Sequence, residues 1–370
     1  MSLKRKITAA MLALLASLSI NLSSVDAKSH YTSTLMRNME FDTFDVGGTL
    51  IFSDSPEYVK QNGILYSDVV SGNARLLYYH LNDSQSDKKL AVIVENVSDQ
   101  FNTLNITRGA ATKPGNKFLS IGKAVLTSYM KNNFKTSLTL QRYERKLLRD
   151  NMHDLVLKPG QLAYGLYDFN VDYPVRITIL MYPPTADPLL YSLGAQVLPK
   201  DEQRLRGTFK EMTRVIRPKK KYNPDADGIV YLLLSDGIND RYKTGIDATD
   251  GSTVTNFGNY GVDYRLEFET HDKTQFYLSP LGGMYAGAMR SNHKGHSRLL
   301  VIPHGKTYFG DETPKEPENV KEAREEGIAL LTNYTELADL GTFDGKVQFE
   351  YAPPAASYLP INIILMPADN

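Results

Sequence analysis

Apolar and polar side chains alternate along much of the chain with the two-residue period of β-strands. The alternation is clear in residues 176–179 and 264–269, where every second side chain is apolar. Residues 91–94 form a continuous apolar run, which is typical of a strand covered on both faces. Turn-forming residues separate these segments at 71–73, 158–160, 250–251 and 344–345. We therefore expect a mainly β protein made of β-sandwiches.

Two octapeptides interrupt this strand pattern. GKAVLTSY (122–129) and GIALLTNY (327–334) are identical at five of their eight positions. Both are rich in good helix formers and follow loop residues. We expect each to begin one short helix that crosses the end of a sandwich, and the alternative is one more strand.

Four further correspondences occur in the same order along the chain. They pair 48–50 with 207–209, 63–66 with 228–231, 92–109 with 266–283, and 174–183 with 360–367. These matches predict two tandem β-sandwich domains related by internal duplication, a first copy at 40–190 and a second at 200–370, each with one short helix. The alternative is that β proteins of similar composition resemble one another by chance.

The second copy contains additional sequence. Between the aligned glycines Gly283 and Gly327 lie 43 residues, against 12 between Gly109 and Gly122. We interpret residues 284–326 as an inserted loop, and because loops vary on a constant scaffold, any function specific to this copy is expected there.

The first 27 residues have the pattern of a secretory signal peptide. A basic start is followed by an apolar run at 7–20 and by Val25-Asp26-Ala27, which suits signal peptidase cleavage. The alternative is an uncleaved anchor. No second apolar run has membrane length, so we expect a secreted or cell-surface protein without a transmembrane segment after cleavage. Export without any cysteine suits a bacterium.

Composition excludes several function classes. The 42 basic and 42 acidic residues leave no net field to attract nucleic acid, so that partner is not expected. The absence of cysteine excludes thiolate metal sites and thiol nucleophiles. The absence of tryptophan weakens the case for a typical sugar-binding site, although the 23 tyrosines could substitute.

Three of the seven histidines lie within twelve residues, inside the predicted insertion. His293, His296 and His304 are candidate ligands for a transition metal, because imidazole suits Zn²⁺ and Cu²⁺. The alternative is a set of solvated loop histidines beside Lys294 and Arg298.

A second metal candidate is the stretch at 223–228, which places oxygen ligands at alternate positions before a glycine. Asn223, Asp225 and Asp227 are therefore candidate calcium ligands. The glutamate that an EF-hand needs at the twelfth position is absent, since Leu234 stands there. The alternative is a turn rich in Asn and Asp that binds no metal. Calcium is the one cofactor the sequence suggests, and otherwise none is expected.

No sequence motif for a serine-hydrolase elbow, a zinc protease or a phosphate-binding loop is present. Paired carboxylates of a glycoside hydrolase would be close only in space, so the sequence does not test for them. The basic stretch 217–221 is interpreted as a solvated loop rather than a binding patch.

Several short motifs resemble a family of secreted β-rich proteins of Gram-positive-type bacteria. The residues that carry the resemblance are 205–209, 258–262, 282–283, 353–354 and 357–360, chiefly in the second copy. Some members carry a copper-amine-oxidase-like N-terminal module beside the β-region. The resemblance implies an export location and an architecture but no catalytic residue.

These features together predict an exported, non-catalytic protein of the cell envelope. Its expected partner is a cell-wall polysaccharide or a surface protein, and two similar domains would raise avidity for a repetitive partner. The alternative is a secreted polysaccharide-acting hydrolase with acidic residues on loops of the second copy.

Overall fold

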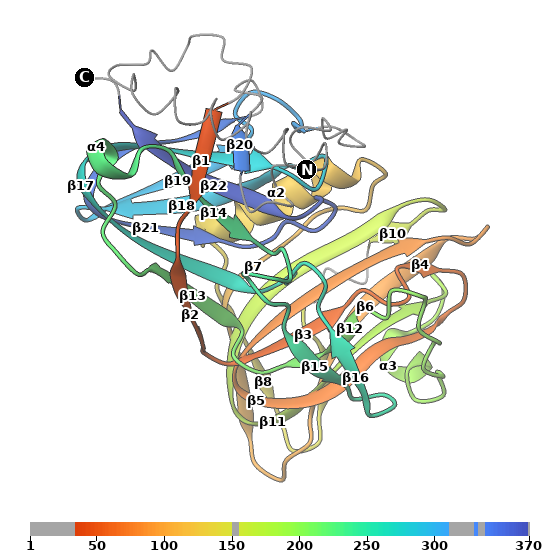
Figure 1. Ribbon diagram of the computed structural model, residues 1–370. Coiled ribbons are helices and arrows are strands. Elements are labelled where there is room, and N and C mark those ends of the chain that lie inside the picture. Colours follow the sequence, from red (N-terminus) through yellow and green to blue (C-terminus); the bar gives the residue numbers. More distant parts are fainter. Residues whose placement is uncertain (1–33, 150–154, 311–328, 332–336, 369–370) are drawn as a thin grey trace, which may run out of the picture.

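The computed structural model describes residues 34–149, 155–310, 329–331 and 337–368. The chain is mainly β, as the alternation predicts, and most strands belong to two large sheets (Figure 1). The predicted signal peptide at 1–27 lies outside the described residues. Within the described ranges, no helix combines the length and apolarity needed to cross a membrane.

The 12-stranded sheet is centred on two long antiparallel strands, β5 and β11. Strand β6 pairs with β11 and is buried over Ala91–Val94, as the continuous apolar run predicts. The strands of this sheet are β3 (Thr49–Ser53), β4 (Tyr58–Val59), β5 (Gly63–Asn82), β6 (Lys88–Asn96), β7 (Asn102–Ala111), β8 (Thr136–Leu140), β9 (Arg145–Leu147), β10 (Val156–Leu157), β11 (Leu162–Tyr182), β12 (Arg206–Phe209), β15 (Thr244–Asp247) and β16 (Ser252–Thr255).

The 10-stranded sheet is centred on β17, which pairs with β21 on one side and with β22 and β13 on the other. Its strands are β1 (Thr34–Asn38), β2 (Phe41–Val46), β13 (Thr213–Pro218), β14 (Val230–Leu234), β17 (Asp263–Pro280), β18 (Gly287–His293), β19 (His296–Ile302), β20 (Ala329–Leu331), β21 (Ala338–Tyr351) and β22 (Ile361–Pro367).

One of the two predicted helices is present. GKAVLTSY lies within α2 (Phe118–Lys131), whose buried face contacts β7 and β11 of one sheet and β18 and β19 of the other. Gly122 permits a further close approach, to the segment between β21 and β22, because a Cβ atom there would lie 2.2 Å from the carbonyl oxygen of Ala355. In GIALLTNY, however, residues 329–331 form strand β20, which pairs with β1, so the predicted helix is wrong there. The other two helices of the described residues are single turns, α3 (Pro188–Tyr191) and α4 (Pro224–Asp227).

The two sheets exchange strands where the chain crosses between them. Strand β2 belongs to the 10-stranded sheet and β3 to the 12-stranded sheet; likewise β12 belongs to the 12-stranded sheet and β13 to the other. The strands on either side of the two crossings pair with each other, β2 with β13 in one sheet and β3 with β12 in the other. Gly48 allows the crossing, since a Cβ atom there would lie 1.8 Å from the carbonyl oxygen of Asn73. The sheets therefore do not coincide with the predicted segments 40–190 and 200–370.

Some of the predicted matches between the two copies occupy equivalent positions in the two sheets, and others do not. Tyr66 pairs with Ile179 in one sheet, as Tyr231 pairs with Ile364 in the other, so two of the predicted matches occupy equivalent ladder positions. In contrast, 48–50 and 207–209 lie on strands that pair directly with each other. The internal duplication stays a prediction.

One hydrophobic core spans both sheets, and a second lies within the 12-stranded sheet. At the contact between the sheets, a buried ionic cluster accompanies the apolar side chains. The Asp168 carboxylate accepts hydrogen bonds from Arg75 Nε (2.6 Å), Arg108 Nη2 (3.1 Å) and the Tyr129 hydroxyl (2.8 Å). From the other sheet, Asp263 and Glu350 face the same guanidinium groups. The cluster thus joins four elements, β5, β7, α2 and β11, to two strands of the 10-stranded sheet, β17 and β21.

Candidate functional site

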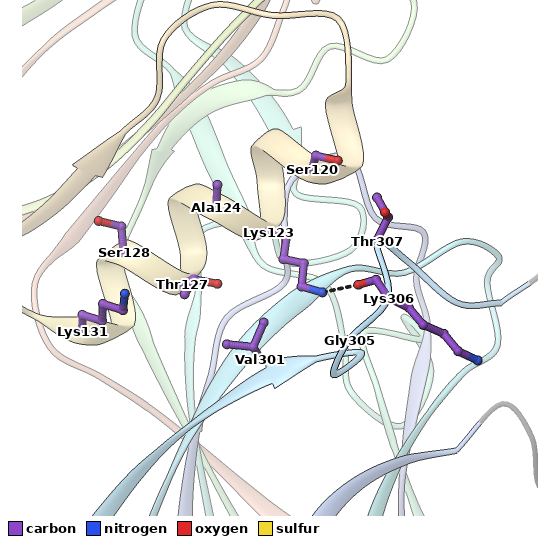
Figure 2. Close-up of a pocket in the computed structure, with 10 residues that line it drawn as sticks. All are labelled: Ser120, Lys123, Ala124, Thr127, Ser128, Lys131, Val301, Gly305, Lys306 and Thr307. Atoms are coloured by element: carbon purple, nitrogen blue, oxygen red, sulfur yellow. Dashed lines mark hydrogen bonds between the residues drawn. The ribbon is translucent and has the colours of Figure 1, made fainter.

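The candidate site is a groove of about 550 Å³ between α2 and the chain that follows β19 (Figure 2). We call it the α2 groove. The helix supplies one wall, and the end of β19 with its following loop supplies the other. The lining residues are Ser120, Lys123, Ala124, Thr127, Ser128, Lys131, Val301, Gly305, Lys306 and Thr307.

The amphipathic pattern of α2 explains why the groove is polar. Its buried positions are Ile121, Gly122, Val125, Leu126, Tyr129 and Met130. From Ser120 onward, the remaining positions recur with the period of the helix and carry lysines, small hydroxyl residues and one alanine. Because Ala124, Thr127 and Ser128 are short, this face leaves a hollow rather than a ridge.

Lys123 connects the two walls of the groove. Its ammonium group donates hydrogen bonds of 2.7 Å to the carbonyl oxygens of Pro303 and Lys306, the second of which is visible in Figure 2. Partial burial lowers the pKa of Lys123. Both partners are neutral oxygens, so they solvate the ammonium group without cancelling its charge. The side chain of Lys306 runs away from the helix in Figure 2 and is exposed.

The structure does not bring the three candidate histidines together. His293 and His296 face each other across the tight turn between β18 and β19, and His293 Nε2 lies 2.8 Å from the carbonyl oxygen of Asp344. His304 follows the other end of β19, so eight residues of mostly extended chain, roughly 25 Å, separate it from His296. The predicted three-histidine ligand set is therefore not formed. Residues 284–310 of the predicted inserted loop are a β-hairpin and its continuation, and 311–326 lie outside the described residues.

The three calcium candidates form a capped turn. The Asn223 side chain accepts a hydrogen bond from the backbone N–H of Asp225 and caps α4. Asp227 uses one carboxylate oxygen on Lys220 and the other on the backbone N–H of Asn223. The side-chain oxygens of Asn223 and Asp227 are therefore engaged by backbone N–H groups of the turn and by Lys220. Across the described part of the chain, no three His, Asp or Glu side chains gather so as to hold a metal ion.

The basic stretch 217–221 borders a second hollow of about 610 Å³ beside β17 and β21. Its residues are not all in a loop, because β13 extends to Pro218. Each of its four cations has an acidic partner: Arg217 pairs with Glu267, Lys219 with Glu40, Lys220 with Asp227 and Lys221 with Glu269. This paired surface has little net charge to offer a ligand.

A third candidate group combines polar side chains that follow β3 with Asp201, which precedes β12. The Asp201 carboxylate accepts hydrogen bonds from Ser55 Oγ (2.8 Å) and from the backbone N–H of Glu57 (2.7 Å). The Oδ1 atom of Asp54 is buried and accepts no hydrogen bond from the described residues. Burial, together with the charges of Glu57 and Asp201, raises the pKa of Asp54 well above its usual value. Burial and the charge of Asp201 also raise the pKa of Glu57.

Sequence reasoning located neither the α2 groove nor the Asp54 cluster. The helix pattern of 118–131 was the available signal for the groove, since its polar stripe carries lysines and small hydroxyl residues. Its second wall comes from residues nearly 180 positions later, as the Lys123–Pro303 contact shows. No local pattern identifies such a partner.

Comparisons with known proteins leave the family open. No protein-family model matches the chain, and no curated protein matches it. Among solved structures, the protein YhaK from Escherichia coli aligns over 89% of this chain and 94% of that chain, with 11% sequence identity and a TM-score of 0.15. A similarity of this size carries no argument about fold or function.

Proposed function

We propose that the chain is an exported, non-catalytic protein of the bacterial cell envelope that binds a wall polymer through the α2 groove. The observation that carries the proposal is the groove itself, an open hollow whose lining residues include lysines and hydroxyl side chains. Such groups can bind the oxygen-rich surface of a polysaccharide or its anionic substituents. The groove's lining residues include no carboxylate, imidazole or thiol that could act as a general base.

The signal-peptide pattern and the resemblance to secreted β-rich proteins support the location in this proposal. A surface protein is the other partner consistent with an exported scaffold. The groove favours the polymer, because protein interfaces usually centre on buried aromatic and aliphatic anchors. Val301 is the largest apolar side chain that lines it.

The test is co-sedimentation of the full chain with purified wall sacculi. Ala124 is exposed and lines the groove, so Ala124→Phe would obstruct the helix wall without changing the charge of the groove. We expect this variant to lose about tenfold in affinity, a free energy of about 1.4 kcal/mol. Ala226→Phe, at an exposed position of α4, is the matched control and should bind normally. Equal retention of both variants, or no retention of the wild type, would count against the proposal.

A secreted hydrolase is a second candidate because of the Asp54 cluster, although Asp54 and Glu57 lie in the first predicted copy and not on the loops of the second copy. Glycoside hydrolysis needs one carboxyl group that keeps its proton and one that is ionised. The raised pKa values of Asp54 and Glu57 beside Asp201 provide groups of the first kind. Tyr58 and Tyr358 are nearby and half-exposed, and tyrosine rings can stack on sugars. Turnover in a screen of glycan substrates, abolished by Glu57→Gln, would favour this candidate.

A further inference from the structure

The α2 groove has an unbalanced local charge in a protein that is neutral as a whole. The ten lining residues include Lys123, Lys131 and Lys306 and no Asp or Glu. The basic stretch 217–221 shows the opposite arrangement, since each of its cations has an acidic partner. A hollow whose described lining residues include lysines and no carboxylate attracts ligands of negative charge.

The hydrogen bonds of Lys123 strengthen this argument. Its ammonium group is held by two carbonyl oxygens, which use two of its three N–H donors. Partial burial disfavours its charge, as its lowered pKa indicates. An anion in the groove would accept the third N–H and restore the electrostatic stabilisation that burial removes.

The spacing of the cations indicates an extended ligand. Lys123 and Lys131 are eight residues apart on α2, or about 12 Å along the helix axis. Lys123 is directed to the opposite wall, so a single small anion cannot use both ammonium groups. Thr127 lies between them on the same face of the helix and can donate a hydrogen bond to the intervening part of the ligand.

We propose that the ligand of the α2 groove is a polyanionic strand linked by phosphodiester groups, a deepening that rests on the proposed function. Lysine binds phosphate as a point charge, and the hydroxyls of Ser120, Thr127, Ser128 and Thr307 supply further donors. A nucleic acid is also a phosphodiester, but its single strands bind chiefly by stacking on aromatic rings. The lining residues of the groove include no aromatic side chain.

The experiment measures binding of the full chain to poly(glycerol phosphate) by titration calorimetry, between about 50 mM and about 200 mM salt. Two ammonium contacts, those of Lys123 and Lys131, predict a slope of log K against log salt of about −1.4, equivalent to about a sevenfold loss over this range. The double variant Lys131→Gln, Lys306→Gln should bind at least about tenfold more weakly, with the slope reduced to about −0.7. The charge-conserving variant Lys131→Arg, Lys306→Arg should retain binding.

Control variants and other polymers distinguish the proposal from its alternatives. Lys158→Gln with Lys210→Gln removes two exposed lysines elsewhere and should leave binding unchanged. If polygalacturonate binds as tightly as poly(glycerol phosphate) or more tightly, the groove recognises carboxylate groups and the phosphodiester proposal is wrong. If single-stranded DNA binds as tightly or more tightly, the groove is a nucleic-acid site and the proposal is also wrong. Unchanged binding by the Gln double variant would overturn the groove as the site. If sacculi retain the chain but poly(glycerol phosphate) does not bind, only this inference fails and the proposed function stands.

Discussion

Replacing Asp168 with asparagine should reveal how strongly the buried ionic cluster stabilises the contact between the two sheets. The carboxylate accepts hydrogen bonds from two guanidinium groups and one phenol, those of Arg75, Arg108 and Tyr129. Arg75 is only 2% exposed. The amide of Asp168→Asn has nearly the same shape as the carboxylate but no charge. The buried guanidinium groups of Arg75 and Arg108 therefore lose the negative charge that balances them.

The remaining acidic side chains of the cluster limit the loss of folding stability in this variant. Asp263 Oδ2 lies 3.9 Å from Arg75 and 3.7 Å from Arg108, and Glu350 pairs with Arg108. Removing one partner of a buried ion pair costs about 3–5 kcal/mol. We expect Asp168→Asn to fall near the lower end, at about 3 kcal/mol, because Glu350 stays in place as a counter-ion of Arg108 and Asp263 is ionised in part at neutral pH. Against a typical stability of about 5–15 kcal/mol, this loss is large.

The assay is urea unfolding at neutral pH, followed by circular dichroism. The matched control is Glu95→Gln, which breaks a 3.3 Å pair with Arg176 at exposed positions of the same sheet and should cost about 0–1 kcal/mol. Adding Arg108→Met to Asp168→Asn should recover part of the loss, since it removes one unpaired cation. A loss below about 1 kcal/mol for Asp168→Asn would refute the reasoning and show that the other anions compensate fully.

Two further predictions concern the same contact. Burial raises the pKa of Asp263 to about 7, so the folded protein keeps a proton that the unfolded chain releases near pH 4, and stability should fall as pH rises through this interval. The variant Asp263→Asn cannot titrate, so this fall in stability should disappear. Relative to the wild type, its free energy of unfolding should increase by up to about 4 kcal/mol between pH 4 and pH 7, and parallel pH profiles of the two proteins would contradict this. Gly122→Ala should destabilise by about 1–3 kcal/mol despite the better helix propensity of alanine, because its Cβ would meet the carbonyl oxygen of Ala355 at 2.2 Å. Ser128→Ala on the exposed face of α2 is the thermal-unfolding control and should change stability little; equal effects of the two would exclude a packing role for Gly122.

Local patterns in the sequence predicted which segments form strands better than they predicted which strands pair with each other. The mainly β class and the strand at Ala91–Val94 followed from periodicity and burial, which are properties of a few neighbouring residues. The exchange of β2 and β12 between the sheets did not, because pairing joins residues some 170 positions apart, such as Val46 and Thr213. No short pattern records which sheet a strand will join.

The two similar octapeptides show the same limit. In GKAVLTSY, helix propensity and a buried face agree, and α2 forms. In GIALLTNY, residues 329–331 pair with β1 instead, so a non-local partner outweighs propensity. The histidines failed as a group for a similar reason, since proximity in sequence becomes separation in space when the chain is extended.

The strand exchange also bears on how the protein can be divided. A fragment ending near residue 200 would contain β2 and β3 but lack β12 and β13, the strands that pair with them. Each fragment made alone would expose unpaired strand edges and aggregate, whereas the two produced in one cell should find each other and reassemble. The molecule would then suit fragment complementation, with recovery of the folded state as the reporter.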